Sequence, residues 1–170
     1  MRIFLIGLTG SGKSTLGKKL AAAIPTEFID LDDYIIQKEK KSISEIFEQY
    51  GEVRFREIEA ASLREVCNIK EAVISTGGGA ACFHDNMTVM NVSGITVFLD
   101  VPIDALTHRL FKQSNRENRP MFKNKTEEEV RAFLNELYEK RVSFYRESKL
   151  TLQGSNISVE RIIEELESID

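Results

Sequence analysis

A segment near the N-terminus has the residue types and spacing that bind phosphate. Residues 7–14 read Gly-Leu-Thr-Gly-Ser-Gly-Lys-Ser, with two glycines five positions apart followed by Lys and Ser. Glycines let the backbone wrap around a chain of phosphates, and the N-terminus of the following helix attracts the anion. Lys13 adds positive charge beside the outer phosphates, and Ser14 is available to ligate Mg²⁺. The residues expected to hold a nucleotide are Gly10, Ser11, Gly12, Lys13, Ser14 and Thr15. A glycine-rich turn without a ligand is the alternative.

Two acids follow a second apolar run, Glu27-Phe28-Ile29-Asp30. Asp30 and Asp32 are spaced i, i+2, so they point to the same face if the strand continues through both. The carboxyl edge of a doubly wound sheet opens onto the ligand crevice. Phosphoryl transfer needs carboxylates there, to organise Mg²⁺ and to receive the proton of the acceptor hydroxyl. Asp33, one residue further on, is interpreted as the start of a turn.

Three glycines, Gly77-Gly78-Gly79, follow the third apolar run, Ala72-Val73-Ile74-Ser75. Consecutive glycines favour neither helix nor strand, and they remove side chains so that a ligand can approach the backbone. The segment is therefore expected to belong to the same ligand crevice. A plain loop is the alternative.

The sequence motif that would recognise guanine as the nucleotide base is incomplete. A GTPase would need Asn-Lys-x-Asp, whereas residues 124–127 read Asn-Lys-Thr-Glu. Thr126 and Glu129 form a capping-box pattern, so this segment is interpreted as the start of a helix. Adenine is therefore favoured over guanine, and a nucleotide-dependent binding switch is disfavoured.

These loops require an alternation of strands and helices to bring them together. Short apolar runs at 3–6, 27–30, 72–75, 95–99 and 150–152 predict strands buried on both faces. Helical spacing predicts helices over 16–24, from Ser42 to Gly51, onward from Glu52, after Thr126 and over 159–166. The alternation predicts an α/β fold with a parallel sheet between helical layers.

Composition excludes several classes of protein. The chain has 170 residues, 27 acids against 23 bases and a formal net charge of −4, which disfavours bulk binding to nucleic acid or to anionic membranes. It has two cysteines, Cys67 and Cys82, interpreted as apolar fillers in a cytoplasmic protein. No apolar stretch has the length of a membrane span. One domain over 1–170 is expected, with a polar, aperiodic segment at about 112–125 interpreted as a functional loop.

Taken together, the motifs resemble those of the shikimate kinase family, within the P-loop nucleoside monophosphate kinase-like group. The segments that carry the resemblance are Gly7 to Ser14, Phe28-Ile29-Asp30-Leu31-Asp32, Gly51-Glu52-x-x-Phe55-Arg56-x-x-Glu59, Gly77-Gly78-Gly79, Asn118-Arg119-Pro120 and Lys140-Arg141-x-x-x-Tyr145. The resemblance implies a three-layer sandwich with a five-stranded parallel sheet of order 2-3-1-4-5. It also implies phosphorylation of the 3-hydroxyl of shikimate by ATP and Mg²⁺, a step of aromatic amino-acid biosynthesis.

The resemblance also implies roles for individual residues. Arg56 and Arg141 match arginines that bind the substrate carboxylate, for which planar guanidinium groups are suited. Asp32 matches the acid that accepts hydrogen bonds from the ring hydroxyls and acts as base or orienter, and Asp30 matches the one that holds Mg²⁺ through water. Gly78 offers its backbone to the substrate. A helical segment at about 33–61 is expected to bind the substrate.

The same resemblance makes residues 112–125 a lid. Arg119 matches an arginine that closes over the transferring phosphate, and Arg116 in the same segment is an alternative to it. Closure would exclude water from the reaction. A monomer is expected, with shikimate and ATP as its ligands.

Several alternatives stay open on the sequence. A gluconate or nucleoside monophosphate kinase could use the same scaffold, and a catalytically idle relative could act as an interaction module. Residues 153–156, Gln-Gly-Ser-Asn, depart from the basic residue that relatives often carry beside the adenine, so no adenine contact is assigned. His84 and His108 are interpreted as structural or surface residues.

Overall fold

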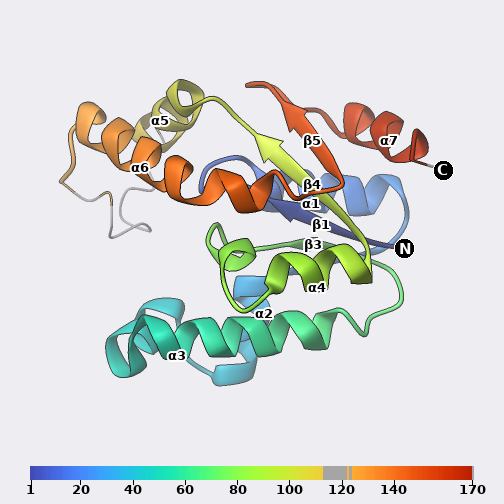
Figure 1. The fold of residues 1–170 in the computed structure, drawn as a ribbon, viewed down its shortest axis with the longest axis horizontal. Helices are drawn as coiled ribbons and strands as arrows, with labels where there is room; N and C mark the ends of the chain where they lie inside the picture. The colour runs from blue at the N-terminus through green and yellow to red at the C-terminus, as the bar shows by residue number, and fades with distance from the viewer. Residues whose placement is uncertain (113–121, 123, 170) are drawn as a thin grey trace.

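Five apolar segments form a parallel sheet in the computed structural model, which describes residues 1–112, 122 and 124–169. The strands are β1 (Arg2–Ile6), β2 (Glu27–Asp30), β3 (Ala72–Ser75), β4 (Ile95–Asp100) and β5 (Leu150–Gln153). They lie in the order β2-β3-β1-β4-β5, with every neighbouring pair parallel (Figure 1). The expected strands and their order are confirmed. All four residues of β3 are buried, as predicted for a strand covered on both faces.

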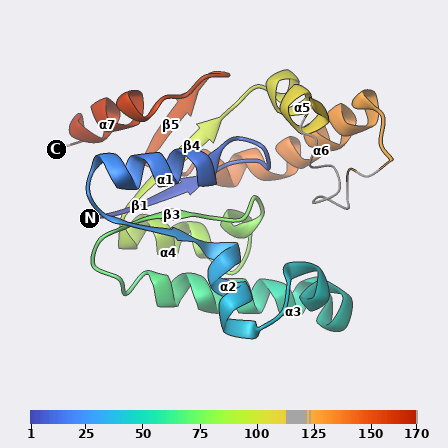
Figure 2. The same ribbon diagram turned by 180° about the vertical axis from the view of Figure 1, so that it is seen from behind.

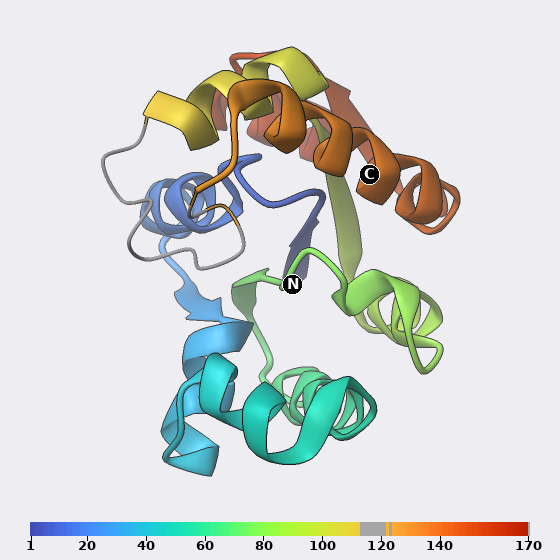
Figure 3. The ribbon, with the colours of Figure 1, turned by 90° about the vertical axis from the view of Figure 1, so that its left-hand side faces the viewer.

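Helices cover the two faces of this sheet. They are α1 (Lys13–Ala23), α2 (Leu31–Glu39), α3 (Ile43–Val66), α4 (Asn86–Ser93), α5 (Ile103–Lys112), α6 (Glu127–Tyr145) and α7 (Val159–Glu167), with a 3-10 turn, η1, at Ala80–Cys82. Helices α4 and α6 lie in front of the strands in Figure 1, and α1 and α7 lie in front in the reverse view of Figure 2. Figure 3 shows α1 and α4 on opposite sides of the strands. The α/β three-layer architecture is therefore confirmed.

The local signals for helix ends are largely confirmed. Ser42 and Thr126 each form a complete capping box with the glutamate three residues later. Gly51 has φ 76° and interrupts α3 with a kink, so the helix continues beyond it in a new direction. Gly51 is itself not helical, so the predicted end of one helix and start of the next at this residue are confirmed.

The register brings the ends of three strands to the same level. Ser75 at the end of β3 is paired with Leu5 of β1 on one side and with Asp30 of β2 on the other. Because the strands are parallel, the segments that follow them leave the sheet at one edge. The phosphate-loop segment, the two acids and the glycine run are therefore neighbours.

The condition for placing Asp30 and Asp32 on one face of a strand is not met. The strand β2 does not continue to Asp32: it ends at Asp30, which is the N-cap of α2. Asp30 Oδ1 accepts a hydrogen bond from the backbone N–H of Asp32 at 3.1 Å, as N-cap carboxylates do. Asp32 therefore lies in the first turn of a helix, and the two acids reach the crevice from a strand end and a helix start.

The predicted lid lies mostly outside the described residues. Lys112 is the last residue of α5, and residues 113–121 and 123 are not described, so Arg116, Arg119 and Pro120 have no position here. Phe122 is buried and meets the Phe133 ring edge-on at 5.7 Å. Within the described part of the chain, no helix combines the length and apolarity needed to cross a membrane.

Candidate active site

The phosphate-loop segment connects β1 to α1 and lines a cavity of about 240 Å³. Gly12 is the N-cap of α1 with φ 93°, a conformation that glycine adopts without strain, and it caps the helix with no side chain. The first N–H groups of α1 are thus left to face an anion. Lys13 is buried, and its ammonium donates hydrogen bonds to the carbonyl oxygens of Gly7 and Leu8, each at 2.9 Å. Helix terminus and ammonium together make this wall of the cavity positive.

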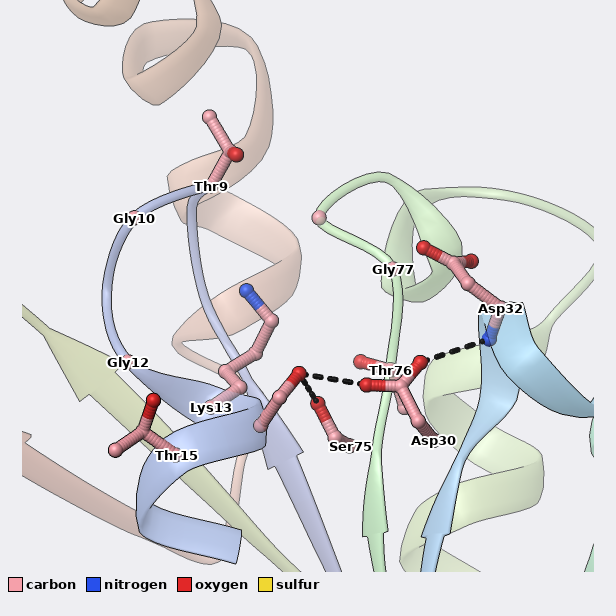
Figure 4. Close-up of a pocket in the computed structure, with 12 residues that line it drawn as sticks. Thr9, Gly10, Gly12, Lys13, Thr15, Asp30, Asp32, Ser75, Thr76 and Gly77 are labelled. Atoms are coloured by element: carbon pink, nitrogen blue, oxygen red, sulfur yellow. Dashed lines mark hydrogen bonds between the residues drawn. The ribbon is translucent and has the colours of Figure 1, made fainter. Parts of the chain in front are cut away.

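A cluster of hard oxygen atoms lies beside the loop. The Ser14 hydroxyl donates to Asp30 Oδ2 at 2.6 Å, and it lies 3.1 Å from the Ser75 hydroxyl (Figure 4). The Ser14 hydroxyl and the Asp30 carboxylate fit Mg²⁺, which prefers oxygen and is held by one or two protein ligands together with phosphates and water. No group of three or more His, Cys, Asp or Glu side chains that could hold a metal occurs among the described residues, so an all-protein cage is not what this site offers. Ser75 was not identified from the sequence.

Asp32 faces the same cavity from the opposite wall, across from Lys13 (Figure 4). Burial, together with the negative charges of Asp30 and Glu59, raises the pKa of this carboxyl from 3.8 to about 6, and Lys13 opposes the rise. A carboxylate with a pKa near 6 is still ionised at neutral pH and is a far better proton acceptor than an ordinary aspartate.

Arg56 on α3 is held in an ion pair that is almost fully buried. Its Nη1 donates to Glu59 Oε2 at 2.7 Å, and its Nη2 lies 3.3 Å from Glu52 Oε1. The Phe83 ring lies 4.3 Å from the guanidinium carbon. Glu59 is 1% exposed, and burial raises the pKa of its carboxyl, against the opposing charge of Arg56. These contacts fix the guanidinium plane.

The glycine run passes between the acids and the arginines. A Cβ at Gly77 would lie 3.3 Å from Asp32 Oδ1, and one at Gly78 would lie 3.4 Å from Arg141 Nη1. A Cβ at Gly79 would lie only 2.6 Å from Arg56 Nη2. Charged groups therefore approach the backbone of this loop closely, and a side chain would be most crowded at Gly79.

Most of the predicted site residues are brought together at this edge of the sheet. The cavity is lined by residues from all three segments, including Gly10, Gly12, Lys13, Ser14, Thr15, Asp30, Asp32 and Gly78. Ser11 is buried within the loop. Arg56 and Arg141 reach the glycine run from α3 and α6. Arg119 and Arg116 lie outside the described residues.

A second hollow of about 380 Å³ lies against the other side of the phosphate loop. It is lined by Gly10, Thr15, Arg109 and Asn156, among others. Arg109 Nη1 donates to the Gly10 carbonyl at 3.2 Å, and Nη2 donates to the Ser155 carbonyl. Arg109 was not identified from the sequence because it lies on α5, a helix that was not predicted.

The remaining predictions about single residues concern histidine and cysteine. His84 and His108 are both exposed, away from the cavity. Cys67 and Cys82 are free and half-buried, and both pack against the hydrophobic core. This fits their interpretation as small apolar residues.

Comparison with known proteins gives a consistent result. Residues 9–169 match the family model described as shikimate kinase. The shikimate kinase of Parabacteroides distasonis is 44% identical over 165 residues, which cover 97% of this chain and 94% of that protein. The shikimate kinase of Bacteroides fragilis is 47% identical over 148 residues, covering 87% and 82%.

Solved structures agree with the sequence relatives. The shikimate kinase of Bacteroides thetaiotaomicron superposes with a TM-score of 0.92 at 40% identity, covering 99% of this chain and 97% of that one. The enzyme from Acinetobacter baumannii, solved in complex with shikimate, gives 0.85 at 30% identity, covering 99% and 91%. A gluconokinase from Sinorhizobium meliloti gives 0.61 at 19% identity, covering 96% and 87%, a likeness of fold alone.

Proposed function

The chain belongs to the shikimate kinase family, and we propose that it transfers the γ-phosphoryl group of ATP to the 3-hydroxyl of shikimate. The observation that carries the proposal is the crevice in which Lys13, Asp32 and the glycine run meet, with two arginines behind the run. One wall suits a phosphate chain and the other suits a hydroxylated carboxylate. These are the two reactants that the family brings together.

The donor side is proposed to be held by the phosphate loop. Lys13 and the N-terminus of α1 supply positive charge to the phosphates. Ser14 and Asp30 would hold Mg²⁺, Asp30 through a water molecule, with Ser75 hydrogen-bonded to Ser14 behind them. When bound, Mg²⁺ neutralises charge on the phosphate oxygens. The hollow beside Arg109 and Asn156 is proposed to take the adenine, because it opens directly from the loop and offers a planar guanidinium group to the base.

Asp32 is proposed to orient the acceptor hydroxyl and to accept its proton. Its carboxylate lies opposite Lys13, so a hydroxyl bound to it faces the position of the outer phosphate. The raised pKa of Asp32 supports this role, since proton transfer is most efficient when the pKa of the base is near the working pH. Arg119, by resemblance, is proposed to stabilise the charge on the transferring group.

Arg56 and Arg141 are proposed to bind the carboxylate of shikimate. Both lie close to the glycine run, Arg56 beside Gly79 and Arg141 beside Gly78. Charge-assisted hydrogen bonds contribute roughly 1.5 to 3 kcal/mol each, so two arginines supply much of a micromolar to millimolar affinity. Glu59 keeps Arg56 in place, while the more exposed Glu52 accepts from its Nε and Nη2, the edge that the ligand would take over.

The proposal is tested by an ADP-release assay with different acceptors. With ATP and Mg²⁺, shikimate should support rapid turnover, while gluconate and nucleoside monophosphates should not raise ADP release above the rate with water. Faster turnover with gluconate would contradict the substrate assignment and favour the other kinase on this scaffold. Product analysis by phosphorus NMR would distinguish transfer to shikimate from stimulated hydrolysis of ATP.

A further inference from the structure

Tyr145, the last residue of α6, is anchored against the core and reaches the glycine run. Its side chain is 1% exposed, and its ring packs on Phe98 of β4 with 4.9 Å between ring centroids. The hydroxyl donates a hydrogen bond to the carbonyl oxygen of Gly78. A buried tyrosine with both its ring and its hydroxyl engaged has little freedom to move. It is a rigid support for the loop that lines the crevice.

The bond from Tyr145 fixes the orientation of a whole peptide unit. The Gly78 carbonyl and the Gly79 N–H belong to one planar trans peptide and point in opposite directions. In a run of glycines this plane would otherwise rotate easily, because glycine has the widest choice of backbone angles. One hydrogen bond therefore sets where the backbone of Gly78 and Gly79 faces.

Arg141 lies one helical turn before Tyr145 and is placed by the same contacts. Its Nη1 is 3.4 Å from the position of a Cβ on Gly78, and its guanidinium lies near enough to the Tyr145 hydroxyl to act on its pKa. Burial raises the pKa of that phenol well above its usual value, and Arg141 opposes the rise. The phenol therefore stays protonated at neutral pH, where it donates to the Gly78 carbonyl.

We propose that Tyr145 is a positioning residue for the carboxylate site: it locks the Gly78–Gly79 backbone and the Arg141 guanidinium at the spacing from Arg56 that shikimate requires. The inference rests on the proposed function. Tyr145 itself lies behind the glycine run and is not among the residues that line the cavity. Its effect on the substrate passes through the loop and through Arg141.

The kinetic test is Tyr145→Phe, with Tyr138→Phe as the matched control. Tyr138 is on the same helix and loses an equivalent hydroxyl, which donates to Asp100 Oδ1 at 3.2 Å, outside the crevice. The Tyr145 variant should raise the KM and the Kd for shikimate about tenfold, since a neutral hydrogen bond is worth up to ~1.5 kcal/mol. The KM for ATP should stay within about twofold, and the control should leave both values unchanged.

A structural measurement separates this inference from the function on which it rests. In ¹⁵N-labelled protein without ligands, the amide resonances of Gly78 and Gly79 should shift or broaden in Tyr145→Phe and not in Tyr138→Phe. This readout needs no substrate, so it decides the positioning role even if shikimate is not the acceptor. Unchanged glycine resonances, or an unchanged affinity for shikimate in a protein that phosphorylates it, would overturn the inference.

A third variant covers the case in which Tyr145→Phe does not fold. Incorporating 3-fluorotyrosine at position 145 keeps the hydroxyl and makes it a stronger donor. The Gly78 and Gly79 resonances should move, whereas the same substitution at position 138 should leave them in place. Equal responses to the two substitutions would show that Tyr145 does not hold the loop.

Discussion

Replacing Asp32 with Asn should make the protein more stable and nearly inactive. In the folded protein, burial and the neighbouring acids raise the pKa of Asp32 from 3.8 to about 6. The folded state therefore holds this proton more tightly than the unfolded state, and stability falls as the pH rises from about 4 to 6. Each pH unit between the two values is worth 1.36 kcal/mol, so the ionised carboxylate costs about 3 kcal/mol above pH 6. Asn is neutral at every pH and removes this cost.

Urea unfolding at several pH values measures the effect directly. At pH 8 the Asp32→Asn variant should exceed the wild type by up to about 3 kcal/mol in free energy of unfolding, and the difference should close as the pH falls below 4. No hydrogen bond is seen to the Asp32 carboxylate within the described residues, so Asn breaks no visible contact. The kcat should fall by about a hundredfold or more, the usual contribution of a general base.

Asp33→Asn is the matched control for this experiment. Asp33 lies in the same first turn of α2, but its side chain is exposed. Its replacement by Asn removes the same favourable interaction with the helix N-terminus. The Asp33→Asn variant should keep both the free energy of unfolding and the kcat close to those of the wild type. If Asp32→Asn proves no more stable than the wild type at pH 8, or if the gain does not depend on pH, the electrostatic account of this site is wrong.

Three further substitutions test other parts of the crevice. Arg56→Lys keeps the charge but loses the planar pair of donors. The KM for shikimate should therefore rise roughly tenfold to a hundredfold, while the KM for ATP stays unchanged. Normal shikimate kinetics would refute the assignment of Arg56 to the carboxylate. Gly79→Ala places a Cβ 2.6 Å from Arg56 Nη2. It should weaken shikimate binding at least tenfold, measured by calorimetric titration. An unaltered Kd would show that the guanidinium moves aside freely. Ser14→Ala should raise the Mg²⁺ concentration needed for half-maximal rate, measured at fixed ATP; an unchanged requirement would exclude the hydroxyl as a ligand.

The sheet and its loops were predictable because their signals are local. Consecutive apolar residues in β1, β3 and β4 reflect burial on both faces, and the capping boxes at Ser42 and Thr126 satisfy N–H groups of their own helices. Helix α4 was missed because its sequence, Asn86–Ser93, is rich in Asn and β-branched residues and has no side-chain cap. Its helical state depends on packing against the sheet.

Site residues that belong to a short sequence motif were predictable. Contacts between residues far apart in the chain were not. The position of Asp32 depends on Asp30 ending the strand and capping α2, which a spacing of two residues does not reveal. Ser75 and Tyr145 contribute through single hydrogen bonds, to Ser14 and to the Gly78 carbonyl, across large separations in the chain. Tyr145 belongs to a motif quoted with Arg141, but such contacts leave no periodic pattern, so only the folded arrangement shows what the two residues touch.

The strand order explains why the glycine run has little space for side chains. Strand β3 lies between β1 and β2, so the loop that follows it separates the phosphate loop from the acids by about one strand spacing, ~4.8 Å, on each side. A Cβ at Gly78 would lie 3.4 Å from the Thr9 amide nitrogen, and one at Gly77 would lie 3.0 Å from Glu59 Oε1. Gly77, Gly78 and Gly79 are all outside the positive-φ region, so their backbone could accommodate any residue. Space, and not conformation, is therefore what disfavours side chains here: a Cβ at Gly77 would press on Glu59 and one at Gly79 on Arg56, so either would disturb the buried Arg56–Glu59 ion pair beside the crevice.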